Sequence, residues 1–127
     1  MKEVMAFIRV NMVNVTKEAL AKSGYPAFSC RKCLGRGKKN IDSAVLKTII
    51  DTGEIPATTV GEHLTESQRL IAKRFFTLIV EDDKVSDVVK IIIDANQTGN
   101  MGDGKIFVLP ICEAYTVRSG EFTTEAY

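Results

Sequence analysis

Two strand–helix–strand patterns, separated by a long irregular stretch, constrain the fold of this 127-residue chain more than any other feature. Runs of β-branched and aromatic residues predict strands, and apolar residues at helical spacing predict the helices between them. In chain order the predicted elements are a strand over 5–10, a helix over 15–23, strands over 27–34 and 75–80, a helix over 85–95 and a strand over 105–111. This order predicts an α+β fold of the split βαβ, ferredoxin-like βαββαβ type.

The ends of these elements carry local signals. Asn14 and Asp83 are the expected N-caps of the two helices, and Gly24 followed by Pro26 is expected to end the first helix. A short extra strand is predicted over 114–118, near the C-terminus. The residues that follow, 122–127, are expected to be mobile or to form an assembly contact.

The predicted helices cover only one face of the sheet. The other face needs a cover as well, and no further helices are predicted that could supply it. The simplest cover is another subunit. A homologous trimer with its sheets facing inward would meet this need.

The stretch between Gly37 and Lys73 is the least regular part of the chain. A short helix or extended arm over 43–51 and a capping box at Thr65 and Gln68 are its only predicted features. An insertion of this length within a compact domain is usually functional or disordered. We interpret it as an interaction loop, with an idle surface excursion as the alternative.

Composition excludes several function classes. A net charge of +1 gives no support for bulk electrostatic binding to nucleic acid. The longest apolar runs are too short to cross a bilayer, and the first residues lack the apolar core of a signal peptide. We therefore expect a cytoplasmic protein that does not insert into membranes.

The three cysteines do not predict a metal site. Cys30 and Cys33 form a C-x-x-C pair, but residues three apart on a strand point to opposite faces of the sheet. No second such pair exists, and the only histidine, His63, lies far along the chain. Ordinary thiols are the preferred interpretation, and a metal or redox pair is the alternative.

The run T-G-N-M-G-D-G-K-I-F-V-L-P-I at 98–111 carries the clearest chemical signal. Gly99, Gly102 and Gly104 allow positive φ angles, and successive N–H groups in such a turn can converge on an anion beside Lys105. The run is not a P-loop, because G-x-x-x-x-G-K-[ST] is absent and a strand follows it. It predicts a phosphate-binding loop, with a simple turn as the alternative.

This run closely resembles the nucleotide-binding B-loop of the PII family of nitrogen-signalling proteins. G-R-G-K at 35–38 resembles the turn that opens the family's T-loop, and V-R-S-G-E at 117–121 resembles its C-loop. The resemblance implies one PII-like domain over 1–127 that assembles as a trimer. Its T-loop would span about 38–72, its B-loop 98–105 and its C-loop 116–121.

The resemblance also implies ligands. ATP or ADP would bind in clefts between subunits, and 2-oxoglutarate would bind beside it through Lys39 and Lys73. The implied nucleotide-binding residues are Ser29, Gly37, Lys38, Gly102, Asp103, Gly104, Lys105 and Arg118.

Three positions depart from the family pattern. Lys39 replaces the glutamine that helps complete a magnesium site, so Mg²⁺ is an open expectation in this chain. Thr116 replaces a C-loop arginine, and Thr77 replaces a glutamate near the ribose. These changes predict weaker phosphate binding.

The long T-loop contains no tyrosine, which excludes control by uridylylation of a loop tyrosine. It resembles the paired nitrogen-fixation branch of the family, and this chain is similar to the second member of that pair. The resemblance implies a non-enzymatic regulator that inhibits dinitrogenase reversibly, as a homotrimer or together with a sister protein. The alternatives are a regulator of an ammonium transporter or other nitrogen-metabolism target, and a small hydrolase.

Overall fold

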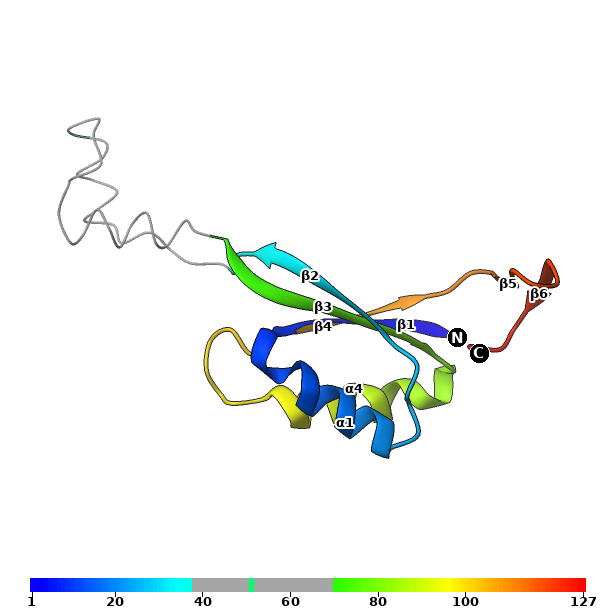
Figure 1. Ribbon diagram of the computed structural model, residues 1–127, viewed down its shortest axis with the longest axis horizontal. Helices are drawn as coiled ribbons and strands as arrows, with labels where there is room; N and C mark the ends of the chain where they lie inside the picture. Colours follow the sequence, from blue (N-terminus) through cyan, green and yellow to red (C-terminus); the bar gives the residue numbers. More distant parts are fainter. Residues whose placement is uncertain (38–50, 52–69) are drawn as a thin grey trace. The chain divides into compact units, whose positions relative to one another are not determined.

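A four-stranded sheet with two helices on one face forms the body of the protein (Figure 1). The computed structural model describes residues 1–37, 51 and 70–127. The strands are β1 (Lys2–Arg9), β2 (Ser29–Gly35), β3 (Ile71–Val80), β4 (Lys105–Pro110), β5 (Ala114–Thr116) and β6 (Glu121–Thr123). The helices are α1 (Val13–Lys22) and α4 (Val85–Asn96), preceded by the 3-10 turns η1 (Val10–Met12) and η2 (Asp82–Lys84).

The chain divides into two compact units, Met1–Cys33 with Ala72–Tyr127, and Leu34–Ile71. The second unit includes most of the predicted T-loop. The helix predicted over 43–51, apart from Asp51, and the capping box at Thr65 and Gln68 lie outside the described residues.

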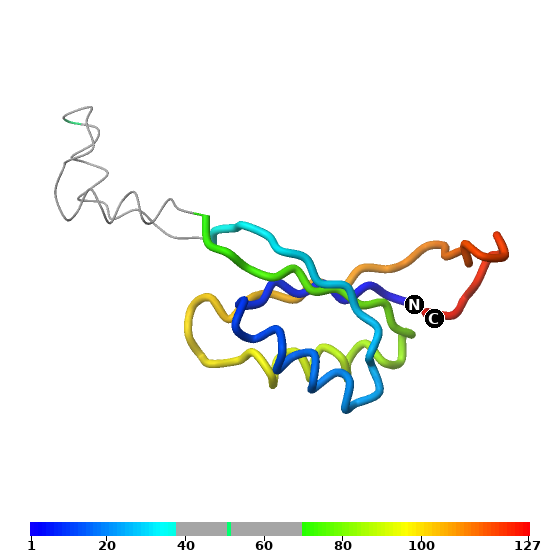
Figure 2. Tube along the Cα trace, in the orientation of Figure 1, coloured from blue at the N-terminus to red at the C-terminus, as the bar shows by residue number. Residues whose placement is uncertain are grey.

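The sheet has the strand order β2-β3-β1-β4, and β1 pairs antiparallel with both β3 and β4. The two helices follow β1 and β3 and lie together against one face of the sheet (Figure 2). This topology confirms the ferredoxin-like prediction. It also places the loop that follows α4 beside the end of β1, where Arg9 lies.

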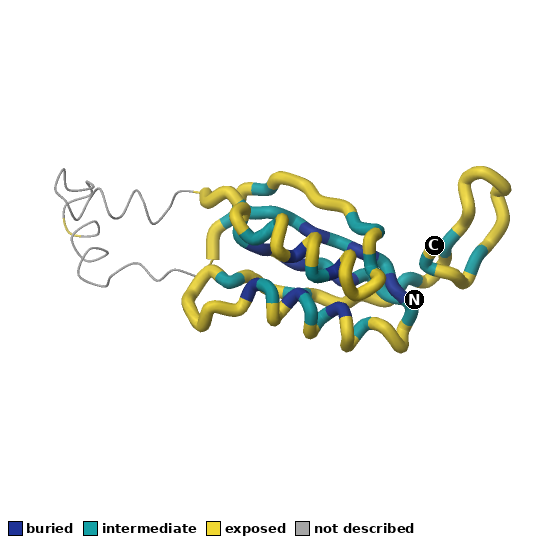
Figure 3. Tube along the Cα trace, turned by 60° about the horizontal axis from the view of Figure 1, so that its bottom comes forward, coloured by how far each residue is buried: buried dark blue, intermediate teal, exposed yellow. Residues whose placement is uncertain are grey.

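The core lies between this face and the helices (Figure 3). Alternate residues of β1 and β3 point into it, as the two-residue period of a strand requires. Leu20 of α1 and Val88 and Ile92 of α4 cover them. The buried strand residues are Val4, Ala6, Ile8, Phe76, Leu78 and Val80.

The opposite face of the sheet carries aromatic side chains that the two helices do not cover. Phe7 packs edge to face against Phe75 at 5.2 Å and against Phe107 at 6.2 Å between ring centroids. Phe7 and Phe107 keep 36% and 42% of their surface exposed. Apolar exposure of this kind on one sheet face is typical of a surface that another subunit covers.

Several predicted boundaries were wrong. β1 begins at Lys2 and ends at Arg9, and β3 begins at Ile71, within the stretch assigned to the T-loop. Asn14 and Asp83 are not N-caps: Met12 and Lys84 occupy those positions without a side-chain capping bond. The reason is that a 3-10 turn precedes each helix and sets where it begins.

The C-terminal prediction also needs correction. Two short strands are present there, because β5 pairs antiparallel with β6. Phe122 and Thr123, expected in a mobile tail, belong to β6. The last residues are attached as well: the amide of Ala126 donates to Glu81 at 2.8 Å, and the hydroxyl of Tyr127 donates to the carbonyl of Ala27 at 3.1 Å.

Candidate functional site

The loop between α4 and β4 has the backbone that its glycines predicted. The φ angles of Gly99, Gly102 and Gly104 are +82°, +98° and +117°, a region that other residues rarely adopt. At Gly104 a Cβ atom would lie 1.9 Å from the carbonyl oxygen of Phe7. The loop therefore approaches β1 so closely that only glycine fits at this position.

The carboxylate of Asp103 closes the loop on itself. It accepts hydrogen bonds from the hydroxyl and amide of Thr98 and from the amide of Gly99. These bonds, above all the one from the Thr98 hydroxyl, hold the pKa of Asp103 well below its usual value. Asp103 therefore stays ionised, and its charge stabilises the structure of the loop.

Two cations from neighbouring strands bind the loop from the sheet. Arg9, at the end of β1, donates to Asp103 at 2.6 Å and to the carbonyl of Met101 at 3.1 Å. Lys73, on β3, donates to the carbonyl of Gly102 at 2.8 Å. Arg9 and Lys73 are directly opposite each other in the sheet, so both reach the same side of the loop.

A third cation lies on the same face of the sheet. Lys105 is paired with Phe7 on β1, and Phe7 shares its face with Arg9 two residues further along. Arg9, Lys73, Lys105 and Asp103 thus lie toward this end of the sheet, and these four side chains together carry a net charge of +2. They lie on the face that the helices leave uncovered, which favours an anion bound at a subunit boundary.

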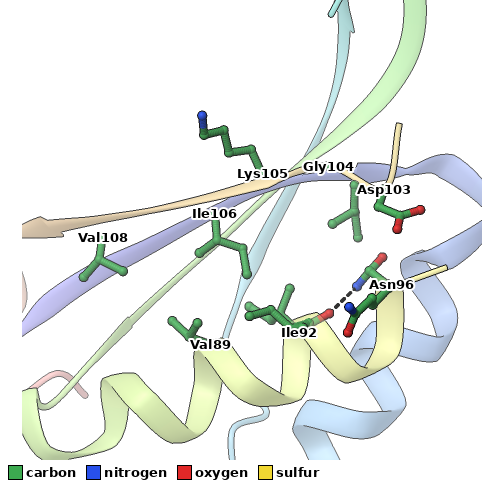
Figure 4. Close-up of a pocket in the computed structure, with 11 residues that line it drawn as sticks. Val89, Ile92, Asn96, Asp103, Gly104, Lys105, Ile106 and Val108 are labelled. Atoms are coloured by element: carbon green, nitrogen blue, oxygen red, sulfur yellow. Dashed lines mark hydrogen bonds between the residues drawn. The ribbon is translucent and has the colours of Figure 1, made fainter. Parts of the chain in front are cut away.

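A cavity of about 470 Å³ adjoins the loop on the other, helix-facing side of β4 (Figure 4). Its walls are mostly aliphatic, and Ile106 and Val108 of β4 point into it toward Val89 and Ile92 of α4. The side chain of Lys105 leaves β4 in the opposite direction. The cavity is therefore mostly apolar, and Asp103, Gly104 and Lys105 line it where it adjoins the loop.

A family model described as "Nitrogen regulatory protein P-II" matches residues 1–121. The chain belongs to the PII family. This family consists of signalling regulators and not of enzymes.

PII relatives of two kinds are similar to the chain over almost its whole length. It is 46% identical to "Nitrogen fixation nifHD region GlnB-like protein 2" of Methanothermococcus thermolithotrophicus, over 95% of this chain and 94% of that protein. It is 39% identical to the protein of the same description from Methanothermobacter marburgensis, over 99% of each. "GlnB-like protein 1" of M. thermolithotrophicus is 36% identical, over 95% and 97%.

A solved PII structure has the same fold. The crystal structure of Arabidopsis thaliana PII bound to citrate superposes with a TM-score of 0.68 at 26% identity, covering 98% of this chain and 87% of that one. The resemblance read from the B-loop, T-loop and C-loop motifs is thus confirmed at the level of family and fold.

Not every residue assigned by that resemblance lies near the loop. Ser29 begins β2. Arg118 lies in the turn between β5 and β6, beyond the far end of β4, which spans about 17 Å from Lys105. Gly37 belongs to the second compact unit, and Lys38 and Lys39 lie outside the described residues. Their roles in binding stay predictions.

Arg9 is the site residue that sequence reasoning missed. It stands in an apolar strand, where a single cation reads as an ordinary outward-facing residue. The only available signal was its position at the strand's end, two residues after Phe7 on the same face. Its contact with a loop more than ninety residues away could not be read from spacing.

The described part of the chain shows neither a cluster of metal ligands nor a membrane-spanning helix. Among residues 1–37, 51 and 70–127, no three histidine, cysteine or acidic side chains are grouped closely enough to hold a metal ion. None of the helices in the described part of the chain is long and apolar enough to span a membrane.

Proposed function

We propose that this chain is a PII-type sensor of ATP or ADP and of 2-oxoglutarate that regulates nitrogen fixation by reversibly inhibiting dinitrogenase. The observation that carries the proposal is the glycine-rich loop, fixed by Arg9, Lys73 and Asp103 and followed directly by Lys105, whose side chain points away from α4. Such a loop supplies backbone donors and a positive charge to an anion without a large ordering cost.

The nucleotide would bind by its phosphates to the segment Gly102–Lys105. The net positive charge at this end of the sheet favours a polyphosphate. By family resemblance, Ser29 would lie near the adenine, and Gly37 and Lys38 would contact the phosphates. Because Arg118 and the loop lie toward opposite ends of β4, Arg118 would come from a neighbouring subunit and grip the phosphates bidentately.

The second ligand, 2-oxoglutarate, would pair with Lys73 and Lys39. An ammonium group has three donors, so Lys73 can keep its bond to Gly102 and still bind a carboxylate. The citrate-bound Arabidopsis structure, in which a PII protein holds a polycarboxylate, supports a carboxylate ligand. Mg²⁺ is an optional part of this proposal, because Lys39 stands where the family has a glutamine.

Assembly completes the site in this proposal. The uncovered aromatic face of the sheet would be buried in a trimer. That trimer would consist either of this chain alone or of this chain with a sister protein, since relatives described as GlnB-like protein 1 and 2 occur in the same organism. We place the assembly in the cytoplasm, where both ligands and dinitrogenase occur.

Regulation requires that the ligands bind two states of the T-loop with different affinity, because equal affinity would shift nothing. A hundredfold change in the affinity for dinitrogenase needs about 2.7 kcal/mol of coupling. One or two charge-assisted hydrogen bonds at Lys73 would supply it. Lys73 lies close to where the T-loop segment returns to the sheet.

A capture experiment tests this function. The protein, with and without a GlnB-like protein 1, is immobilised with ATP and exposed to dinitrogenase. We expect capture that added 2-oxoglutarate reverses, and a Lys73→Ala variant that captures dinitrogenase but no longer releases it. Absence of capture under every ligand condition would exclude the proposed target, and normal release by Lys73→Ala would exclude Lys73 as the sensor of 2-oxoglutarate.

A further inference from the structure

We infer that Arg9 and Lys73 are positioning residues that turn two backbone amides of the B-loop toward the bound anion. The inference rests on the proposed nucleotide site and concerns how this chain builds it. Neither cation has to touch the nucleotide for this role. Each cation binds a carbonyl group of the loop and so orients the N–H group of the same peptide toward the nucleotide.

The planarity of the peptide bond determines where the N–H groups of the loop point. In a trans peptide the C=O and N–H groups point in opposite directions. Arg9 binds the carbonyl of Met101 and Lys73 binds the carbonyl of Gly102. The N–H groups of the same two peptides belong to Gly102 and Asp103, and they are therefore turned away from the two cations.

Both of these N–H groups are available to a ligand. Within the described residues, neither the Gly102 nor the Asp103 amide makes a hydrogen bond of good geometry to the protein, and the turn over Met101 and Gly102 only brings the Asp103 amide toward the carbonyl of Asn100. Gly102 is exposed and Asp103 is half-buried. Two adjacent free amides that share one orientation are the usual elements of an anion-binding concavity.

Gly102 has to be glycine because of its backbone. Its φ of +98° is unfavourable for other residues. A Cβ atom there would lie 3.4 Å from Nη2 of Arg9 and 3.7 Å from Nζ of Lys73, which are ordinary contact distances. The two cationic groups thus lie directly beside this residue.

The binding of the loop by Arg9 and Lys73 also explains why two cations face each other on adjacent strands. Arg9 and Lys73 are directly opposite each other on adjacent strands, a placement that destabilises a sheet. The ion pair between Arg9 and Asp103 offsets this cost. The same ion pair neutralises the carboxylate of Asp103, which would otherwise repel the bound anion.

Asp103→Asn tests the positioning role in one direction. If Arg9 contacted phosphate directly and Asp103 only repelled it, removal of the negative charge would strengthen ATP binding and exclude the positioning role. If Arg9 acts through Asp103 and the loop, the same substitution removes the partner of Arg9 and weakens the binding. Because Asp103 also closes the loop through Thr98 and Gly99, weaker binding has to be combined with a measurement on Arg9 itself.

The experiment measures ATP affinity calorimetrically for the full-length assembled protein and its variants. We expect Arg9→Gln and Asp103→Asn each to weaken ATP binding about 10-fold, and the double variant to lose no more than either single one. Arg9→Lys should retain part of the affinity. Lys17→Gln, which removes an exposed cation from α1, is the charge-matched control and should leave ATP affinity unchanged.

A second readout does not depend on the nucleotide. Amide hydrogen exchange of Thr98 and Gly99, whose N–H groups donate to Asp103, should accelerate in ligand-free Arg9→Gln and stay normal in Lys17→Gln. Tighter ATP binding by Asp103→Asn, or unchanged exchange in Arg9→Gln, would overturn the positioning role. If the wild-type protein binds no ATP at all, the proposed function fails, and the exchange measurement alone decides on Arg9.

Discussion

At the scale of single residues, Gly104 is the position with the least tolerance. A Cβ atom there would overlap the carbonyl oxygen of Phe7, and its φ of +117° is unfavourable for any other residue. We predict that Gly104→Ala lowers the free energy of unfolding by about 2–4 kcal/mol, measured by urea denaturation.

Gly120 provides the matched control for this prediction. Its φ is +73°, but a Cβ atom there would meet nothing within 4 Å. Gly120→Ala should therefore cost only the conformational strain, about 1 kcal/mol. Equal losses in the two variants would show that the close approach of the loop to β1 contributes nothing.

The carboxyl group of Asp103 makes the stability of the folded protein depend on pH. Its pKa is depressed in the folded protein, above all by the hydroxyl of Thr98, while the pKa of an unfolded aspartate is about 3.9. Its contribution to stability is thus present above about pH 4 and is lost as the pH falls toward the lower, folded-state pKa.

Melting temperatures of the wild-type protein and Asp103→Asn test this dependence between pH 7 and pH 3. We expect the wild-type protein to be the more stable near neutrality and the difference to shrink below pH 4. A constant difference across the range would mean that the ionised carboxylate does not stabilise the loop.

Some of these residue roles could be predicted and some could not. The run of glycines beside Lys105 predicted positive φ angles and a loop that can bind an anion. Lys73 and Asp103 were also identified, but their contacts with the loop depend on which strands are neighbours. Arg9 was missed for the same reason: its partners, Met101 and Asp103, are distant in sequence and come close only through the pairing of β1 with β3 and β4.

At the scale of elements, α4 connects the core to the loop. Ile92 is 1% exposed in the core, whereas its neighbour Ile93 is 43% exposed beside the apolar cavity. We predict that Ile92→Ala lowers the free energy of unfolding by about 2–5 kcal/mol and that Ile93→Ala lowers it by about 1 kcal/mol. Chemical denaturation of both variants checks this ratio, and similar losses would contradict the packing of α4.

Element type was easier to predict than element ends. Alternation of buried and exposed residues in β1 and β3 follows directly from the two-residue period of strands, so their core faces were predictable. The helix starts were not, because a 3-10 turn before each helix removes the need for a capping side chain. The hairpin of β5 and β6 was read as a single strand, since three-residue strands carry almost no periodicity.

At the scale of the whole molecule, the aromatic face of the sheet is the expected subunit contact. We predict that Phe107→Glu converts a trimer to monomers, because it places a charge on the apolar face that the trimer would bury. Size-exclusion chromatography with light scattering measures the mass. Val15→Glu, on the exposed surface of α1, should leave the trimer intact. A trimeric Phe107→Glu protein would place the subunit contact elsewhere.

Titration of the assembled protein with ATP tests the central proposal most directly, because the sensor function and the positioning roles both depend on it. We predict saturable binding of one ATP per chain, with affinity about 10- to 100-fold lower in Lys105→Ala, which removes a charge-assisted bond to phosphate. Absence of ATP binding by an intact trimer, or unchanged affinity in Lys105→Ala, would contradict the account.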